Sequence, residues 1–123
     1  MNPLLHAAAT LGRLGSSPME SRPVDLAAQG LDPEAPGIAS RALNVNGVRW
    51  ALVEYEPGVL REEWCEVGHS GYVLAGEVVY EFADGDEPLA LGAGDAFTLA
   101  DGEAHRGRAG PQGARLFLID RAG

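Results

Sequence analysis

The feature that most constrains the fold is a series of short apolar stretches separated by turn residues. From Ile38 onward such stretches recur about every eight to twelve residues, a spacing typical of all-β domains. The 17 glycines and eight prolines of this 123-residue chain fall between and within these stretches. Frequent turn residues favour many short strands over long helices. The sequence therefore predicts a small all-β barrel or sandwich.

Two β-hairpins and two or three further strands are predicted. The first hairpin turns at Asn46-Gly47, a dipeptide that supplies the positive φ angles of a two-residue turn. The second turns at Asp84-Gly85-Asp86. The stretches expected to form the strands are residues 38–45 and 48–58, 71–83 and 87–92, and parts of 92–105 and 114–120.

The chain divides into a polar or irregular beginning and a strand-rich remainder. Residues 1–37 are expected to form an N-terminal arm and cover segment, and residues 38–123 a single barrel domain. Within the arm, residues 1–22 are predicted to be mobile or to lend a strand to a partner subunit. Residues 24–31 are expected to form either a short helix or an irregular cover, ended by the prolines that follow.

Composition excludes several classes of partner. The formal charge is −9, every basic residue is arginine and no basic stripe is present, so nucleic-acid binding is not expected. A single cysteine cannot form an internal disulfide. The first residues lack the basic start of a signal peptide, and no later segment is apolar enough to span a bilayer. A cytoplasmic protein is therefore expected, and the abundance of Ala, Gly and Arg suggests a bacterial source.

One short segment combines three side chains that bind metals. Glu63 and Cys65 alternate along a predicted strand, which places them on one face with Trp64 on the other. His69 follows after a glycine that suits a sharp bend. Carboxylate, thiolate and imidazole are all ligands of divalent transition metals. A fourth ligand is available in His105, at the predicted start of a later strand.

The chain resembles the cupin superfamily over about residues 48–120. The second cupin motif contains a glycine, five residues, Pro-x-Gly, two residues and a histidine. Here it is matched by Gly94, by Ala100 in place of the usual proline, by Gly102 and by His105. The resemblance implies a cupin jelly-roll β-barrel, or double-stranded β-helix, with a metal site inside it.

The first cupin motif is present with its ligand types exchanged. The segments YVLAGEV (residues 72–78) and EPG (residues 56–58) match the family pattern. Counted from them, the two family histidines fall on Glu63 and Cys65, and the family glutamate falls on His69. The chain is thus similar to small single-domain cupins with a Trp-Cys pair before Gly-His, and the resemblance implies the ligand set Glu63, Cys65, His69 and His105.

This exchange of ligands changes the expected chemistry of the metal. A glutamate, a thiolate and two neutral histidines would leave a divalent ion nearly neutral, which makes it a weaker Lewis acid. The thiolate favours zinc over manganese or magnesium, while nickel, iron and copper remain alternatives. Four protein ligands would form a closed site, and such sites are usually structural.

Each candidate ligand also has an alternative role. Cys65 is open to interpretation as a small buried apolar residue, since free cysteine is among the most buried residue types. The alternative for His69 is a hinge residue that hydrogen-bonds a backbone carbonyl. The alternative for His105 is a surface residue beside Arg106. Glu63 belongs to an acidic run with Glu62 and Glu66, which is more often a solvated edge.

Three functions follow from these observations. The first is a metal-dependent enzyme acting on a small organic molecule inside the barrel. The second is a non-catalytic binding or sensing domain, and the third is a barrel with a structural zinc site. No catalytic residue or organic cofactor is identified. Arg49, Arg106 and Arg108 are the cationic candidates for an anionic substrate, and a homodimer is expected because sheet edges readily pair.

Overall fold

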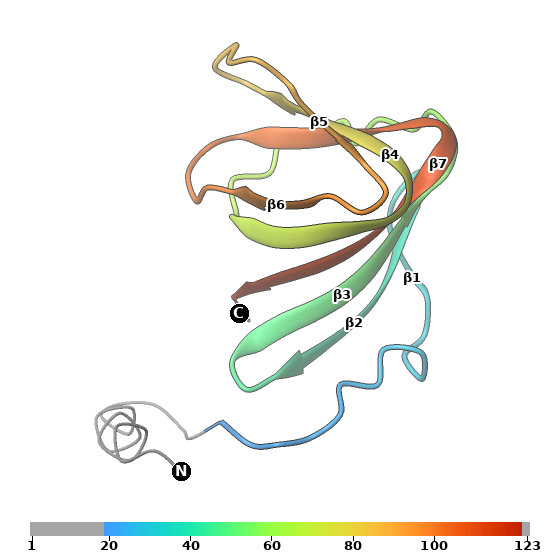
Figure 1. Cartoon of the computed structure of the whole chain (residues 1–123), viewed down its shortest axis with the longest axis vertical. Coiled ribbons are helices and arrows are strands. Elements are labelled where there is room, and N and C mark those ends of the chain that lie inside the picture. The colour runs from blue at the N-terminus through green and yellow to red at the C-terminus, as the bar shows by residue number, and fades with distance from the viewer. Residues whose placement is uncertain (1–18, 122–123) are drawn as a thin grey trace.

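The computed structural model describes residues 19–121 of the chain, and these residues form a seven-stranded antiparallel sheet curved into a barrel (Figure 1). The strands are β1 (Asp32–Ala35), β2 (Ile38–Val45), β3 (Val48–Tyr55), β4 (His69–Phe82), β5 (Leu89–Gly92), β6 (Ala96–Leu99) and β7 (His105–Arg121). The predicted all-β barrel is confirmed.

The two longest strands, β4 and β7, build the barrel. The strand order is β1-β2-β3-β7-β4-β5, and β6 also pairs with β4. The first part of β4 pairs with the second part of β7, and the last part of β4 pairs with the beginning of β7, with register shifts between Val73 and Ala75 and between Gly76 and Val78. Such irregularities bend strands, and Figure 1 shows both strands curving around the interior.

Both predicted hairpins are present. β2 and β3 pair from Ile38–Tyr55 to Val45–Val48. Asn46 and Gly47 join them with φ angles of 55° and 76°, so the Asn-Gly dipeptide forms the turn that its conformational preferences predict. β4 and β5 pair across the turn that contains Gly85.

The core lies between the curved faces of the sheet and is formed by alternate residues of the strands. Val73, Val78 and Leu116 are completely buried. Burying an aliphatic side chain of this size stabilises a fold by about 1.5–3 kcal/mol. The buried side chains of the central strands belong to one cluster, which gives the pocket described below a rigid wall.

The sheet begins before residue 38. β1 is a four-residue edge strand that pairs only with β2, and it includes Pro33. Proline is tolerated there because an edge strand leaves one side of its backbone unpaired. Residues 24–31 form turns and irregular structure rather than a helix. The predicted mobile or strand-lending arm falls largely on residues 1–18, outside the described residues. No helix among residues 19–121 has the length and apolarity required to cross a membrane.

Candidate metal centre

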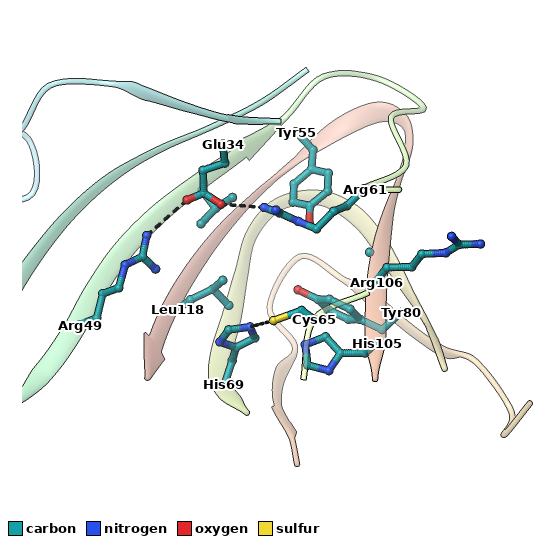
Figure 2. A pocket seen from close by; sticks show the side chains of 12 residues that line it. Glu34, Arg49, Tyr55, Arg61, Cys65, His69, Tyr80, His105, Arg106 and Leu118 are labelled. Carbon is teal, nitrogen blue, oxygen red and sulfur yellow. Dashed lines mark hydrogen bonds and ion pairs between the residues drawn. The ribbon is translucent and has the colours of Figure 1, made fainter. Parts of the chain in front are cut away.

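A cavity of about 120 Å³ lies inside the barrel. Figure 2 shows two groups of polar side chains in it: His69, Cys65 and His105 at one end, and Glu34 between two arginines at the other. Leu118 of β7 lies between the two groups. The cavity is therefore polar at both ends and held by strands that are distant in sequence.

Cys65 is fixed by backbone pairing with His105. The two residues form an isolated antiparallel bridge, in which the Cys65 N–H donates to the His105 carbonyl at 2.8 Å and the His105 N–H donates to the Cys65 carbonyl at 2.9 Å. The Cys65 thiol is half-buried and lines the cavity. Its neighbour Trp64 is exposed and lies under the Arg106 guanidinium, with 4.1 Å between Cζ and the ring centroid. This contact is close enough for a cation–π interaction.

His105 is the first residue of β7, as the sequence predicts, and it is only 2% exposed. Its Nδ1 lies 2.8 Å from the Glu103 carbonyl oxygen, so Nδ1 carries the proton and donates. Its Nε2 is buried and has no hydrogen-bond partner among the described residues. An unpaired buried acceptor is costly, and a metal ion would satisfy it. The interpretation of His105 as a surface residue is excluded.

His69 is the first residue of β4, and a neighbouring carboxylate orients it. Its Nδ1 lies 2.9 Å from Asp120 Oδ2, and its Nε2 lies 3.8 Å from Cys65 Sγ. Burial lowers the pKa of His69, and this effect outweighs the rise caused by Asp120. The ring is therefore neutral at pH 7, with its proton on Nδ1 and its Nε2 lone pair toward Cys65.

The glycine before His69 lies beside a bend of the chain at Val67, and it also has a steric role. A Cβ on Gly68 would lie 2.7 Å from the Leu99 carbonyl oxygen and 2.8 Å from the Asp101 nitrogen. The Gly68 N–H also donates to Asp101 Oδ1 at 2.8 Å. Only glycine allows the chain to pass this close to the loop after β6, and this approach sets where β4 and His69 begin.

Three of the four predicted ligands form a cluster that suits a transition metal. One ligand atom from each of Cys65, His69 and His105 lies within 4.8 Å of the others. The 3.8 Å between Cys65 Sγ and His69 Nε2 is near the ~3.6 Å that separates two ligands on one tetrahedral zinc ion. Both histidines also have an anchored Nδ1, as metal-bound histidines usually do. The donor set therefore fits a thiophilic divalent ion.

Glu63 lies outside this cluster. Its side chain is exposed and lines a separate depression with Ala35, Pro36 and Val59. Alternation of side chains holds only in a regular strand, and residues 61–68 form none: Cys65 makes a single bridge there. For that reason Glu63 does not share the direction of Cys65, although their spacing in the sequence suggests that it would.

The cavity contains polar residues that the sequence did not single out. Asp120, which orients His69, has a side chain that is 6% exposed. Glu34 and Arg61 lie at the other end of the cavity. Asp120 ends the apolar stretch ARLFLID. An acidic residue at the end of a buried strand was the only indication in the sequence that Asp120 belongs to the site. Glu34 and Arg61 lie in charged segments that normally face solvent, so the sequence carried no signal for them.

Two tyrosines contribute protonated hydroxyl groups to the cavity. Burial raises the pKa of Tyr55, and the neighbouring Arg61 only partly offsets this rise. Burial likewise raises the pKa of Tyr80, far above its ordinary value. Tyr80 also contacts His105 edge-on, with 6.0 Å between the ring centroids. Both phenols are therefore protonated hydrogen-bond donors at neutral pH.

Solved structures share this fold at low sequence identity. An RmlC-like cupin from Shewanella frigidimarina matches with a TM-score of 0.68 and 18% identity, over 85% of this chain and 93% of that chain. The polyketide cyclase RemF from Streptomyces resistomycificus matches with a TM-score of 0.68 and 22% identity, over 85% and 81%. Bacillus subtilis oxalate decarboxylase matches with a TM-score of 0.67 and 18% identity, over 85% of this chain but 31% of that chain.

A family model shows which family the chain belongs to, whereas the structural matches alone show only its fold. No curated protein matches the sequence significantly. The model of the EutQ-like cupin domain, however, matches residues 44–112. This range is more than half of the chain and contains Cys65, His69 and His105. The chain belongs to the EutQ-like cupin domain family.

Proposed function

We propose that this cupin holds a divalent transition metal through Cys65 Sγ, His69 Nε2 and His105 Nε2, and that it acts as a metal-dependent enzyme on a small organic molecule in the adjoining cavity. Three protein ligands leave a coordination position for water or substrate, as in catalytic zinc sites. This differs from the closed four-ligand site expected when Glu63 is included.

The observation that carries the proposal is the shared orientation of the two histidines. Each has its Nδ1 bonded to a protein acceptor, His69 to Asp120 and His105 to the Glu103 carbonyl. Each therefore has a free lone pair on Nε2: that of His69 lies 3.8 Å from the Cys65 sulfur, and that of His105 is buried without a partner among the described residues. A structural histidine gains nothing from a buried, unpaired Nε2, whereas a ligand requires one.

The remaining residues of the site orient these donors and shield them. Asp120 holds the tautomer and ring angle of His69, and backbone pairing to His105 holds the thiol. Tyr80 and Leu118 exclude bulk water from one side of the cavity. One thiolate and two neutral imidazoles would leave a divalent ion with a net charge of +1, so the bound ion would act as a Lewis acid and attract anions.

Zinc is the metal that this donor set favours. Thiolate and imidazole together suit zinc, whereas carboxylate and water suit manganese. The Mn(II) centres named for oxalate decarboxylase belong to that protein. Nickel, iron and copper also bind these donors. Elemental analysis of the bound metal distinguishes them from zinc.

Elemental analysis of the purified protein tests the proposal. We expect about one zinc per chain in the parent, and loss of metal in Cys65→Ala and His105→Ala, each of which removes a donor atom. Glu63→Gln is the matched control, because Glu63 lies outside the cluster, and it should retain the metal. Circular dichroism confirms that each variant is folded.

Other results would identify the alternatives. No metal in the parent after reconstitution with zinc, nickel, iron and copper would exclude the site. Loss of metal in Glu63→Gln would restore the four-ligand site and favour a structural role. A metal that exchanges no ligand with added cyanide or imidazole would likewise contradict an open coordination position.

A further inference from the structure

A second polar group lies at the end of the cavity away from Cys65. Arg49 belongs to β3 and Arg61 to the segment after β3, and both line the cavity. Glu34 lies between them (Figure 2). The Glu34 Oε1 is 2.7 Å from Arg61, and its Oε2 is 3.3 Å from Arg49. Two guanidiniums thus hold the two oxygens of one carboxylate.

A β-bulge directs Glu34 into this position. In the pairing of β1 with β2, Pro33 faces Ala39 and Ala35 faces Ile38, so Glu34 is the extra residue between two successive pairs. A bulge of this kind re-aims a side chain and is common beside functional sites. β1 is a short edge strand that pairs on one side only, so Glu34 lies at the margin of the sheet.

The two arginines differ in what else they contact. Arg49 Nη1 also lies 3.9 Å from Asp120. Within residues 19–121, Glu34 is the only carboxylate in ion-pair contact with Arg61. Arg61 lies beside the protonated Tyr55 hydroxyl, a further donor to an anion. Displacement of Glu34 would therefore expose a set of donors suited to a carboxylate, which guanidinium groups recognise with two parallel hydrogen bonds.

The other candidate arginines are engaged elsewhere. Arg106 donates to Glu81 at 3.1 Å and to the Glu62 carbonyl at 3.1 Å, and Figure 2 shows its guanidinium directed away from the cavity. Arg108 also pairs with Glu81, at 3.6 Å, and half of its side chain is exposed. Of the arginines singled out in the sequence, Arg49 alone faces the second polar group.

We propose that Arg49 and Arg61 form the subsite for the carboxylate of a short-chain organic acid, and that Glu34 occupies this subsite until the acid displaces it. The cavity of about 120 Å³ is far smaller than the roughly 300–1,000 Å³ of pockets for drug-sized ligands. The acid accordingly has only a few carbon atoms. This inference names the substrate class of the proposed enzyme and rests on it, although the arginine subsite itself needs no metal.

Isothermal titration calorimetry with propionate and malonate, each beside its neutral amide, tests the proposal in zinc-loaded and chelator-treated protein. We expect the acids to bind and the amides to bind at least about tenfold more weakly, because charge-assisted hydrogen bonds are lost. Arg61→Gln should reduce binding of the acids about tenfold or more, and Arg61→Lys less. Glu34→Gln should strengthen binding, a gain that misfolding cannot produce.

Two variants serve as controls. Arg108→Gln removes a cation outside the cavity and is the control for Arg61→Gln. Glu54→Gln removes a surface carboxylate that lies 3.8 Å from Arg115, and it changes the net charge by the same amount as Glu34→Gln. Neither should alter acid binding. Acid binding that is unaffected by Arg61→Gln and lost with the metal would overturn the subsite but leave the metal proposal intact. Unchanged or weaker binding in Glu34→Gln would also overturn it. Arginine-dependent binding in a parent protein that takes up no metal even after reconstitution would support the subsite and contradict the proposed enzyme.

Discussion

Cys65 and His105, forty positions apart in the sequence, exchange both of their backbone hydrogen bonds. This pairing places the thiol and the buried imidazole side by side without help from the side chains themselves. Substitution of either side chain therefore leaves the backbone scaffold in place, and its effect on metal binding is separable from its effect on folding.

The Cys65→Ser variant tests the thiolate ligand. Serine retains the size of cysteine but is a much poorer donor to soft ions, so zinc affinity should fall by more than the roughly 10–100-fold that loss of a supporting contact causes. The cobalt-substituted parent should show a thiolate-to-cobalt charge-transfer band that the variant lacks. Stability of the metal-free protein should change by less than about 1 kcal/mol. A parent spectrum without the band would rule out sulfur ligation.

Asp120→Asn tests the orientation of His69. The amide can present its NH₂ to Nδ1 and favour the opposite tautomer, which would remove the lone pair from Nε2. We expect zinc affinity to fall about 10–100-fold, measured by competition with a chromophoric chelator. Asp32→Asn, an exposed substitution outside both groups of potential metal ligands, is the control. Equal affinities in the two variants would show that Asp120 does not act on the metal through His69.

Gly68→Ala tests the close approach of the chain to the loop after β6. The new Cβ would meet backbone atoms at 2.7 and 2.8 Å, so the free energy of unfolding should fall by about 1–3 kcal/mol in urea titrations. The matched control is Gly92→Ala, where a Cβ has nothing within 4 Å. A change in that control should stay within about 0.5 kcal/mol. Equal stability of the two variants would contradict the steric role.

The pH dependence of stability tests the Glu34 ion pairs. Burial raises the pKa of Glu34, but Ser40, Arg61 and Arg49 together bring it below the ordinary value of 4.5. A depressed pKa contributes stability that is present above pH 4.5 and is lost as the pH falls through the lower folded-state value. Glu34→Gln should thus be less stable than the parent by about 1 kcal/mol at pH 7. The two unfolding free energies should converge in acid, and a constant difference would contradict the ion pairing.

Much of the barrel was predictable from local sequence because local rules govern it. The Asn46-Gly47 turn fixes the first hairpin, and His105 begins a strand after a glycine with a φ of 81° at position 102. β1 was missed because Pro33 normally interrupts strands, and only its place at the sheet edge makes it acceptable. The expected homodimer, cytoplasmic location and bacterial source remain predictions.

The candidate site was only partly predictable because it depends on non-local contacts. Cys65, His69 and His105 stand at motif positions. Glu63 also stands at one, but strand alternation, the other reason for its selection, fails in a segment that forms no continuous strand. Asp120 lies 51 positions from His69, and Glu34 lies 27 positions from Arg61. Pairing across such separations arises from the barrel topology, which a single sequence does not display.

The two ends of the cavity differ in how they are anchored. Both histidines open the two longest strands, whose mutual pairing defines the barrel, whereas Glu34 sits on an edge strand and Arg61 on a loop. A substitution at the histidine end is tolerated only if β4 and β7 still pair. A substitution at the arginine end affects only the contacts of an edge strand and a loop. We therefore expect evolutionary change of ligand preference in this scaffold to concentrate at the arginine end, while the end with the two histidines stays constant.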